Sequence, residues 1–292
     1  MAGVEISVVV PARGRPERLG ACLAALERQS YPGERFEVIV VDDGSQPPLA
    51  PRSGSLQFSL IRQDNAGPAA ARNSGAARAR GTFLAFTDDD CLPTAGWLAE
   101  LVASLNRYPG SLVGGAVLNG LAGNQFAAAS QLLVGYLYSY YNEAPGRARF
   151  FTSNNIAMPA NRYRELGGFD PAFPAAAGED RWFCESWRSR GWPMWYCPGA
   201  VVLHHHAMGW SGFWRQHFRY GQAAHEFHRK RAAASGAAIR LEPGRFYRDL
   251  LLFPWSRGEA RPIRMAALLG ISQLANALGY ARARLGSPAR GP

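Results

Sequence analysis

The sequence has few of the features that mark secreted or membrane-spanning proteins. Its four cysteines are widely spaced along 292 residues and form no C-x-x-C pair, so nothing indicates an oxidising compartment or a thiolate metal site. The N-terminus has no basic start followed by a long apolar run, so we expect no signal peptide. Residues 265–280 form the most apolar stretch, but it is too short and too polar for a transmembrane helix. These absences predict a cytoplasmic protein, with the inner face of the membrane as the alternative location.

The composition is that of a folded protein with an uneven charge. Apolar residues make up 47% and charged residues 18% of the chain, which excludes intrinsic disorder. Of the 32 Lys/Arg and 22 Asp/Glu, 14 and 4 respectively lie after residue 206, and these account for the whole net charge of +10. The positive surplus therefore belongs to the C-terminal segment.

Strand-like and helix-like segments alternate in the N-terminal part. Short apolar runs rich in β-branched or aromatic residues predict strands, and segments with helical spacing or a proline start predict helices. The expected strands are residues 6–10, 36–41, 56–61 and 82–86, and the expected helices are residues 16–29 and 68–80. Further along the chain, residues 151–158 and 195–203 are also expected to be strands. This alternation predicts an α/β fold with a mostly parallel central sheet and helices on both faces. In such sheets, ligands bind beyond the carboxyl ends of the strands.

Polar residues follow three of these strands. Residues 11–13 come after the first strand, Asp42 and Asp43 after the second, and residues 88–90, all aspartates, after the fourth. Adjacent carboxylates repel one another unless a cation or hydrogen bonds hold them. A hard divalent ion, Mg²⁺ or Mn²⁺, would relieve this repulsion and bind a diphosphate. A solvated acidic turn is the alternative interpretation of the triplet.

Six sequence motifs occur in a fixed order over residues 5–206. They are SVVVPARGRPERL, VIVVDDGS, NAGPAAARNSGAARARG, FLAFTDDDC, GGFDPAF and GED. In this series the sequence resembles the inverting GT-A glycosyltransferases of family 2. The resemblance implies a nucleotide-sugar-binding fold and transfer of a sugar to a hydroxyl acceptor.

The resemblance assigns the metal and donor-phosphate roles. Asp88 and Asp90 are the outer carboxylates of a D-x-D motif, in which Asp90 holds the metal and Asp88 meets the ribose or the metal, while Asp89 belongs to the nucleotide-sugar site. A divalent ion would stabilise the negative charge on the departing nucleoside diphosphate. A histidine after the strand at residues 195–203 completes the metal shell, with His204 as first choice and His206, on the same strand face, as second.

The same resemblance assigns the nucleotide contacts. Asp43 is expected to meet the base, beside the backbone from Pro11 to Arg13. Arg72 and Asn73 lie on the helix that starts at residue 68, whose N-terminus suits phosphate or ribose oxygens. A capped turn for Asp43 and an ordinary ion pair for Arg72 remain open as alternatives.

Catalysis is expected at Glu179 and Asp180. Inversion needs a base that takes the proton from the attacking hydroxyl. By the resemblance Asp180 is this base and Glu179 is its acceptor-side or orienting partner. Trp182, one turn away, is expected to stack on a sugar of the acceptor, with a place in the core as the alternative, and Asn155 is also expected to contact the acceptor. Acidic residues at a helix start are also ordinary N-caps and dipole partners.

Three segments are expected along the chain. Residues 1–115 would bind the nucleotide-sugar, residues 116–206 would bind the acceptor and carry the base, and residues 207–292 would form a basic, aromatic-rich helical segment. The mixture of aromatics and arginines from Trp210 onward suits an anionic membrane surface, or a helix packed on the catalytic domain, better than nucleic acid.

The predicted function is metal-assisted, inverting sugar transfer. The donor would be a UDP-, GDP- or dTDP-sugar, and the acceptor a glycan or a lipid-linked molecule. A sugar-nucleotide nucleotidyltransferase would share the sheet and the metal site, but the sequence has no Gly-rich phosphate loop with a lysine after the first strand. A non-catalytic basic module that binds membrane or nucleic acid is the third hypothesis.

Overall fold

The computed structural model describes residues 3–51, 54–173, 177–235 and 242–286. The chain groups into two compact units. The first unit is drawn from residues 1–120, 138–172 and 179–205, and the second from residues 121–137, 173–178 and 206–292. Helix α4 (Gln125–Tyr141) runs from the second unit into the first.

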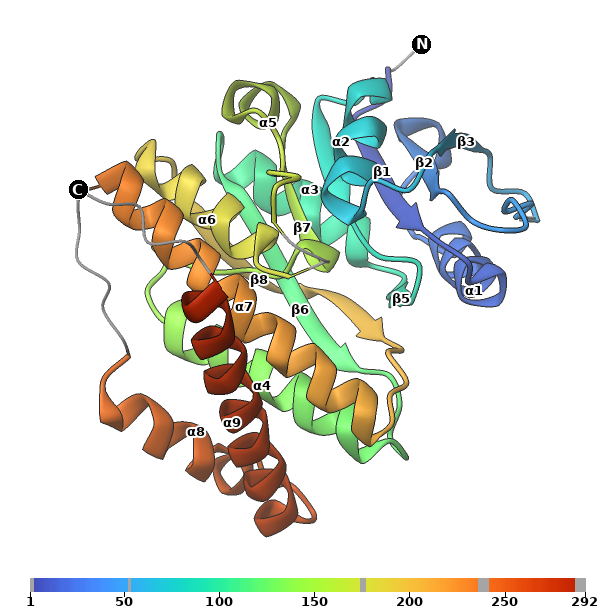
Figure 1. Ribbon diagram of the computed structural model, residues 1–292. Coiled ribbons are helices and arrows are strands. Elements are labelled where there is room, and N and C mark those ends of the chain that lie inside the picture. Colours follow the sequence, from blue (N-terminus) through green and yellow to red (C-terminus); the bar gives the residue numbers. More distant parts are fainter. Residues whose placement is uncertain (1–2, 52–53, 174–176, 236–241, 287–292) are drawn as a thin grey trace. The chain divides into compact units, whose positions relative to one another are not determined.

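The first unit is built on a sheet of eight strands within the described residues, in the order β3-β2-β1-β4-β7-β6-β8-β5 (Figure 1). These strands are β1 (Ile6–Ala12), β2 (Phe36–Asp43), β3 (Phe58–Gln63), β4 (Phe83–Phe86), β5 (Cys91–Pro93), β6 (Leu112–Asn119), β7 (Ile156–Pro159) and β8 (Met194–His204). The pairs β1/β2, β1/β4, β2/β3 and β6/β8 are parallel, whereas β7 and β5 pair antiparallel with their neighbours. The expected mostly parallel sheet is confirmed.

Helices cover both faces of this sheet, as expected. Alternate side chains of a strand point to opposite faces. Val8 and Val10 belong to the core that includes the apolar stripes of two helices, whereas Val9 faces Gly75 of another helix. The helices of the first unit are α1 (Pro16–Glu27), α2 (Pro68–Arg78), α3 (Trp97–Arg107), α5 (Ala160–Leu166) and α6 (Glu179–Ser189), of which α1 and α3 share the face of Val8 and α2 carries Gly75.

Several elements of the first unit were not expected from the sequence. Strand β6 contains Gly114 and Gly115, which weaken any strand signal. Glycine is required there because a Cβ on Gly114 would lie 2.1 Å from the ring of Phe151. The strand expected over residues 151–158 begins only at Ile156, because residues 153–155 form a 3₁₀ turn. Strand β5 and helices α3 and α5 were also missed.

The second unit is helical, which confirms the expectation for the C-terminal segment. Its helices include α7 (Trp210–Ser235), α8 (Gly244–Ser256) and α9 (Pro262–Gly286). Helices α7 and α9 meet at glycines: a Cβ on Gly221 would lie 1.9 Å from the carbonyl oxygen of Asn276, and one on Gly279 would lie 1.9 Å from that of Phe218. Within the described part of the chain, no helix has the length and apolarity to span a membrane.

Candidate functional site

Loops at the carboxyl ends of β1, β2 and β3 enclose a polar cavity of about 550 Å³. Its lining residues come from three adjacent strand ends: Arg13, Gly14, Gly44, Ser45, Gln46, Arg62, Asp64 and Asn65. This is the edge of a parallel sheet at which ligands bind. Arginines with acidic and amide groups suit the phosphates and the base of a nucleotide.

A hydrogen bond and a close backbone approach hold the cavity loops together. The Oγ of Ser45 accepts a hydrogen bond from the backbone N–H of Gly14 at 2.8 Å, which ties the loop after β2 to the loop after β1. Gly44 has a φ of +74°, and a Cβ there would lie 2.7 Å from the backbone nitrogen of Asn65. Both the left-handed backbone and the close approach therefore require glycine at this position.

Asp43 lies at the end of β2, where the sequence placed it, but its carboxylate is engaged within the chain. One oxygen accepts hydrogen bonds from Gln63 and from the N–H of Ala66, and the other from the N–H of Gly67. Gly67 precedes the first residue of α2. Asp43 thus holds the loop that starts α2, and its expected contact with a base stays a prediction.

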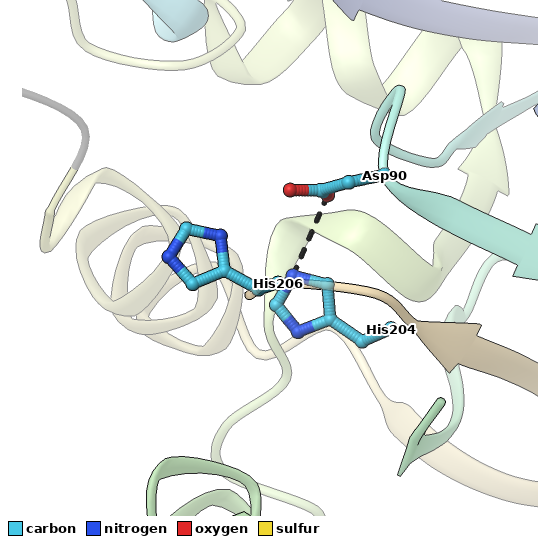
Figure 2. Close-up of side chains that lie close together, drawn as sticks. All are labelled: Asp90, His204 and His206. Atoms are coloured by element: carbon cyan, nitrogen blue, oxygen red, sulfur yellow. Dashed lines mark ion pairs between the residues drawn. The ribbon is translucent and has the colours of Figure 1, made fainter. Parts of the chain in front are cut away.

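The acidic triplet meets the end of β8 through a short antiparallel ladder. In this ladder Cys91 pairs with His204, and the N–H of His205 donates to the carbonyl oxygen of Asp90 at 2.8 Å. The Nε2 of His204 lies 3.4 Å from the Oδ1 of Asp90 (Figure 2). Asp90, His204 and His206 each offer one ligand atom, and these atoms lie within 4.8 Å of one another. This cluster brings Asp90 together with both candidate histidines, whereas Asp88, the other predicted metal ligand, pairs with Arg72. The metal roles of these residues stay predictions.

The donor atoms of this cluster fit a divalent cation of the Mn²⁺ type. One carboxylate oxygen and imidazole nitrogens are acceptable to Mn²⁺, and the cluster contains no thiolate. Asp90 is almost fully buried, whereas His204 is about one quarter exposed, so a ligand can still reach the pair from solvent.

Arg15, which the sequence analysis did not select, pairs with two aspartates of the triplet. Its guanidinium contacts both oxygens of Asp89 and donates to the Oδ2 of Asp90 at 2.9 Å. Arg18 approaches the same oxygen of Asp90 at 3.5 Å. The Oδ1 of Asp90 faces His204 instead. Arg15 therefore fixes the orientation of the carboxylate that is expected to bind the metal.

Asp89 is the fully buried member of the triplet. Burial raises the pKa of Asp89 to about 7, because repulsion from Asp90 and Asp88 adds to it and the Arg15 guanidinium offsets only part of the shift. A buried charge of this kind requires a partner. Asp89 thus anchors Arg15, although its expected contribution to nucleotide-sugar binding stays a prediction.

Arg72 joins the triplet to the start of α6. It donates to the Oδ1 of Asp88 at 2.7 Å and to the Oε1 of Glu179 at 3.2 Å. Its side chain is only 3% exposed. Burial alone would lower the pKa of Arg72, but the two carboxylates raise it, so the guanidinium stays charged. Asp88, Arg72 and Glu179 therefore belong to one ionic network.

Asp180 lies next to this network, in the first turn of α6. Its Oδ1 accepts a hydrogen bond from the N–H of Arg181 at 2.7 Å. Burial and repulsion from Glu179 raise the pKa of Asp180 to about 7. A carboxylate whose pKa lies near the working pH can accept a proton efficiently, as a general base must.

Two residues that were predicted to contact ligands bond to groups of the protein; for Asn73 the predicted contact with the nucleotide-sugar stays a prediction. Asn73 donates to the carbonyl oxygen of Phe169 at 2.7 Å, and its own oxygen accepts from the hydroxyl of Tyr163 and the N–H of Phe169. Asn155 is completely buried and bonds only to protein groups, so the expectation that it touches the acceptor is corrected. Trp182 is half-buried on α6, and its acceptor contact stays a prediction.

The sequence missed two arginines of the site, Arg15 and Arg62. Each lies close to a position that the sequence predicted at a strand end. Arg15 is two residues after Arg13, and Arg62 is one residue after the strand that was expected to end at residue 61. Arg62 lines the cavity and donates to the carbonyl oxygen of Ser45 at 3.3 Å. Their closeness to strand ends was a signal that the sequence contained. However, arginine is common at protein surfaces, so this signal alone did not distinguish Arg15 and Arg62 from other arginines.

Comparison with known proteins identifies the family. The chain belongs to glycosyl transferase family 2, whose family model matches residues 7–166, more than half of the 292 residues. Glycosyltransferase AglE of Haloferax volcanii is 38% identical over 120 residues, which cover 38% of this chain and 39% of AglE. The pre-mycofactocin glycosyltransferase of Mycobacterium tuberculosis is 29% identical over 210 residues, which cover 69% of this chain and 43% of that protein. The chain thus matches about two fifths of each of these curated relatives.

Solved structures show the same fold at low sequence identity. The mannosyltransferase PcManGT from Pyrobaculum calidifontis, in complex with GDP-Man and Mn²⁺, has a TM-score of 0.59 at 20% identity, with 97% of this chain and 81% of that chain covered. TarS residues 1–349 of S. aureus, in complex with UDP, has a TM-score of 0.50 at 15% identity, with 98% and 93% covered. The expected GT-A fold and family 2 membership are therefore confirmed.

Proposed function

We propose that the protein is an inverting, metal-assisted glycosyltransferase that moves a sugar from a nucleoside-diphosphate-sugar to a hydroxyl group. The observation that carries this proposal is the contact of one buried guanidinium, that of Arg72, with both Asp88 and Glu179. It brings the acidic triplet, which suits the donor phosphates, to the helix start that holds the candidate base. Family membership and the two ligand-bound structural neighbours support the donor class.

The donor nucleotide would occupy the cavity at the ends of β1, β2 and β3. Arg13 and Arg62 supply positive charge there, and Asp64 and Asn65 supply hydrogen-bonding groups for a base. The relatives with bound nucleotides hold GDP-Man in one case and UDP in the other. A GDP-sugar and a UDP-sugar are therefore the first two donors to test.

Asp90 and His204, with His206 as the further ligand, would hold Mn²⁺ or Mg²⁺. The bound ion would supply Lewis-acid stabilisation of the charge that develops on the leaving diphosphate. Arg15 bonds to the Oδ2 of Asp90, while the Oδ1 of the same carboxylate faces His204. Arg72 remains charged beside Asp88 and can add positive charge near the same phosphates.

Asp180 would act as the general base. It would take the proton from the acceptor hydroxyl as that oxygen attacks the anomeric carbon, and the sugar would invert its configuration. Glu179 would act indirectly, through its ion pair with Arg72. The acceptor is proposed to be a glycan or a lipid-linked molecule, as in polysaccharide biosynthesis, with Trp182 at its binding site. A lipid-linked acceptor would bring the protein to the inner face of a membrane.

The decisive variant is Asp180→Asn. We expect transfer from a UDP- or GDP-sugar in the presence of Mn²⁺ to fall by roughly 10²–10⁴-fold, because the amide cannot accept the proton. Binding of the donor, measured by calorimetry, should change by less than about twofold, because Asp180 is proposed to act on the acceptor. In the unmodified protein the rate should rise with pH through about 7, the pKa of Asp180, because only the ionised form is a base.

The matched control is Glu185→Gln, which removes a carboxylate from the same helix. Glu185 pairs with Arg188 on the helix surface, so its loss should leave transfer within about twofold. Full activity of Asp180→Asn would remove the base assignment. A purified chain that binds no nucleoside diphosphate with Mn²⁺ would instead reject the transferase proposal.

A further inference from the structure

Helix α8 is apolar on two neighbouring faces, and within the described residues one face is buried and the other is exposed. Phe246, Leu250 and Pro254, spaced by four residues, are buried. The next stripe around the helix is exposed, and it consists of Tyr247, Leu251, Leu252 and Trp255. Positions four residues apart lie above one another on a helix, so these side chains form one continuous patch. An amphipathic helix usually carries polar residues at such positions.

Helix α9, which packs against α8 and α7, repeats this pattern. Its exposed large apolar side chains recur at intervals of four, seven and eleven residues, and they are Ile263, Leu274, Leu278 and Leu285. These intervals keep the side chains on one face of the helix. Ile263 and Leu285 are 77% and 86% exposed, values that leave almost the whole side chain in water.

The apolar stripes are accompanied by a large excess of positive charge. Residues 244–286 contain seven arginines and two acidic residues. The five arginines of α8, of the connection to α9 and of the first turn of α9 are all exposed: Arg245, Arg248, Arg257, Arg261 and Arg264. Asp249 is paired with Arg248, so it does not form a separate acidic patch.

We propose that this α8–α9 surface, meaning the exposed apolar stripes of the two helices with their arginines, binds the surface of an anionic lipid bilayer. Leucine, isoleucine and tryptophan side chains would enter the boundary between headgroups and acyl chains, and the arginines would meet lipid phosphates. The helices would lie in the plane of the surface. A site of this kind needs no membrane-spanning helix.

Charge favours a lipid surface over a second copy of the chain as the occupant. Two copies that paired through these faces would bring two sets of seven arginines together, with only two acidic residues in each set. An anionic bilayer has the complementary charge. The aromatics of α7, which the sequence suggested for this role, fit less well, because Phe213 is completely buried and Trp210 is the exposed exception among the large apolar residues of that helix.

The test is co-sedimentation of the full chain with extruded vesicles. Vesicles of phosphatidylcholine with about one third phosphatidylglycerol should bind the protein at least about tenfold more tightly than vesicles of phosphatidylcholine alone. Raising the salt concentration to about 1 M should weaken this binding, because the Debye length falls to about 3 Å. The vesicles contain neither donor nor acceptor, so the result is independent of sugar transfer.

Two double variants distinguish vesicle binding through the α8–α9 surface from nonspecific adsorption through exposed leucines elsewhere on the chain. Leu251→Ser with Leu252→Ser removes leucines that are 38% and 55% exposed, and it should reduce binding to anionic vesicles at least about tenfold. The control is Leu60→Ser with Leu118→Ser, which removes leucines of the first unit that are 43% and 50% exposed, and it should bind like the unmodified chain.

Three outcomes would overturn the proposal. The first is equal binding to neutral and anionic vesicles, and the second is an equal effect of the two double variants. The third is a dimer in light scattering that only the α8 variant dissociates, because the surface would then be an interface between copies. All four exposed leucines can be replaced without emptying a core position, so thermal melting curves should stay close to that of the unmodified chain.

Discussion

At the scale of single residues, the three aspartates of the triplet have different partners. Asp88 pairs with Arg72, Asp89 with Arg15, and Asp90 with both Arg15 and His204. Each carboxylate is thereby held in a separate orientation, although the three are adjacent in sequence. Because Arg15 already neutralises part of the negative charge, we expect the protein without nucleotide to bind a divalent cation only weakly.

Replacing Arg15 should make this metal binding tighter. In Arg15→Gln, the charge that opposes the cation at Asp90 is lost, so the affinity for Mn²⁺ without nucleotide should increase at least about threefold. Free Mn²⁺ can be measured by electron paramagnetic resonance, with no need for activity. Arg13→Gln is the control, since Arg13 lines the nucleotide cavity. Unchanged or weaker Mn²⁺ binding by Arg15→Gln would show that Arg15 serves the metal site only by orienting Asp90.

The sequence predicted which residues would lie together at the strand ends, but it did not predict all of their hydrogen-bond partners. Asp90 and His204 could be placed together because the family resemblance assigns both to the metal, and the structure pairs the strands that carry them. The engagement of Asp43 and Asn73 with backbone groups depends on loops 20 to 100 residues away in the chain, which no local pattern reveals. A short polar side chain after a strand is equally typical of a ligand contact and of a loop anchor.

At the scale of elements, the pairing of β6 with β8 contains an irregularity that Asn155 stabilises. The register passes from Gly115 opposite Cys197 to Ala116 opposite Val201, so the ladder is interrupted between these pairs. The Nδ2 of Asn155 donates to the carbonyl oxygens of Ala116 and Ala200, at 2.8 and 2.9 Å. Its Oδ1 accepts from the indole of Trp97 at 2.8 Å. Asn155 thus satisfies two carbonyl oxygens at the interruption of the ladder and one buried indole N–H on α3.

Asn155→Ala should therefore destabilise the protein. Three buried polar groups lose their partner, and unfolding free energy should fall by roughly 2–4 kcal/mol. Urea denaturation followed by tryptophan fluorescence measures this change. The control is Asn161→Ala, which affects an exposed residue on α5 and should change stability by less than about 0.5 kcal/mol. Equal stability of the two variants would mean that other groups satisfy the interrupted ladder.

The elements that the sequence failed to predict are the ones that complete the site. Strand β5 has three residues, too few for a periodic pattern, yet its pairing with β8 places Asp90 beside His204. Strand β6 carries two adjacent glycines, which tertiary packing requires and propensity disfavours. The alternating strands and helices up to residue 86 were predictable because their patterns are local and repeat.

At the scale of the whole molecule, the family match covers only part of the candidate site. The family match ends at residue 166, before α6 and β8. Asp180 and His204, the candidate base and metal ligand, lie beyond it. Their assignment therefore rests on the network through Arg72 and on the β5–β8 ladder, together with the sequence motif around residues 178–180.

The positive charge of the molecule is also divided along the chain. Residues 1–206 contain 18 basic and 18 acidic residues, whereas residues 207–292 contain 14 and 4. The composition predicted a basic C-terminal segment of helices, and this is observed in the described residues. It could not predict which side chains remain exposed, because burial on α7, α8 and α9 depends on how these helices pack.

The most direct test of the site is calorimetric binding of GDP and UDP with Mn²⁺ and with a chelator. We expect at least one of the two nucleotides to bind at least about tenfold more tightly with Mn²⁺, because the cation would join Asp90 and His204 to the diphosphate. The Asp90→Asn variant should bind the nucleotide with the same weak affinity in Mn²⁺ as in the chelator. Equal affinities with Mn²⁺ and with the chelator, or an Asp90→Asn variant that keeps the full effect of Mn²⁺, would contradict a metal-linked diphosphate site at these strand ends.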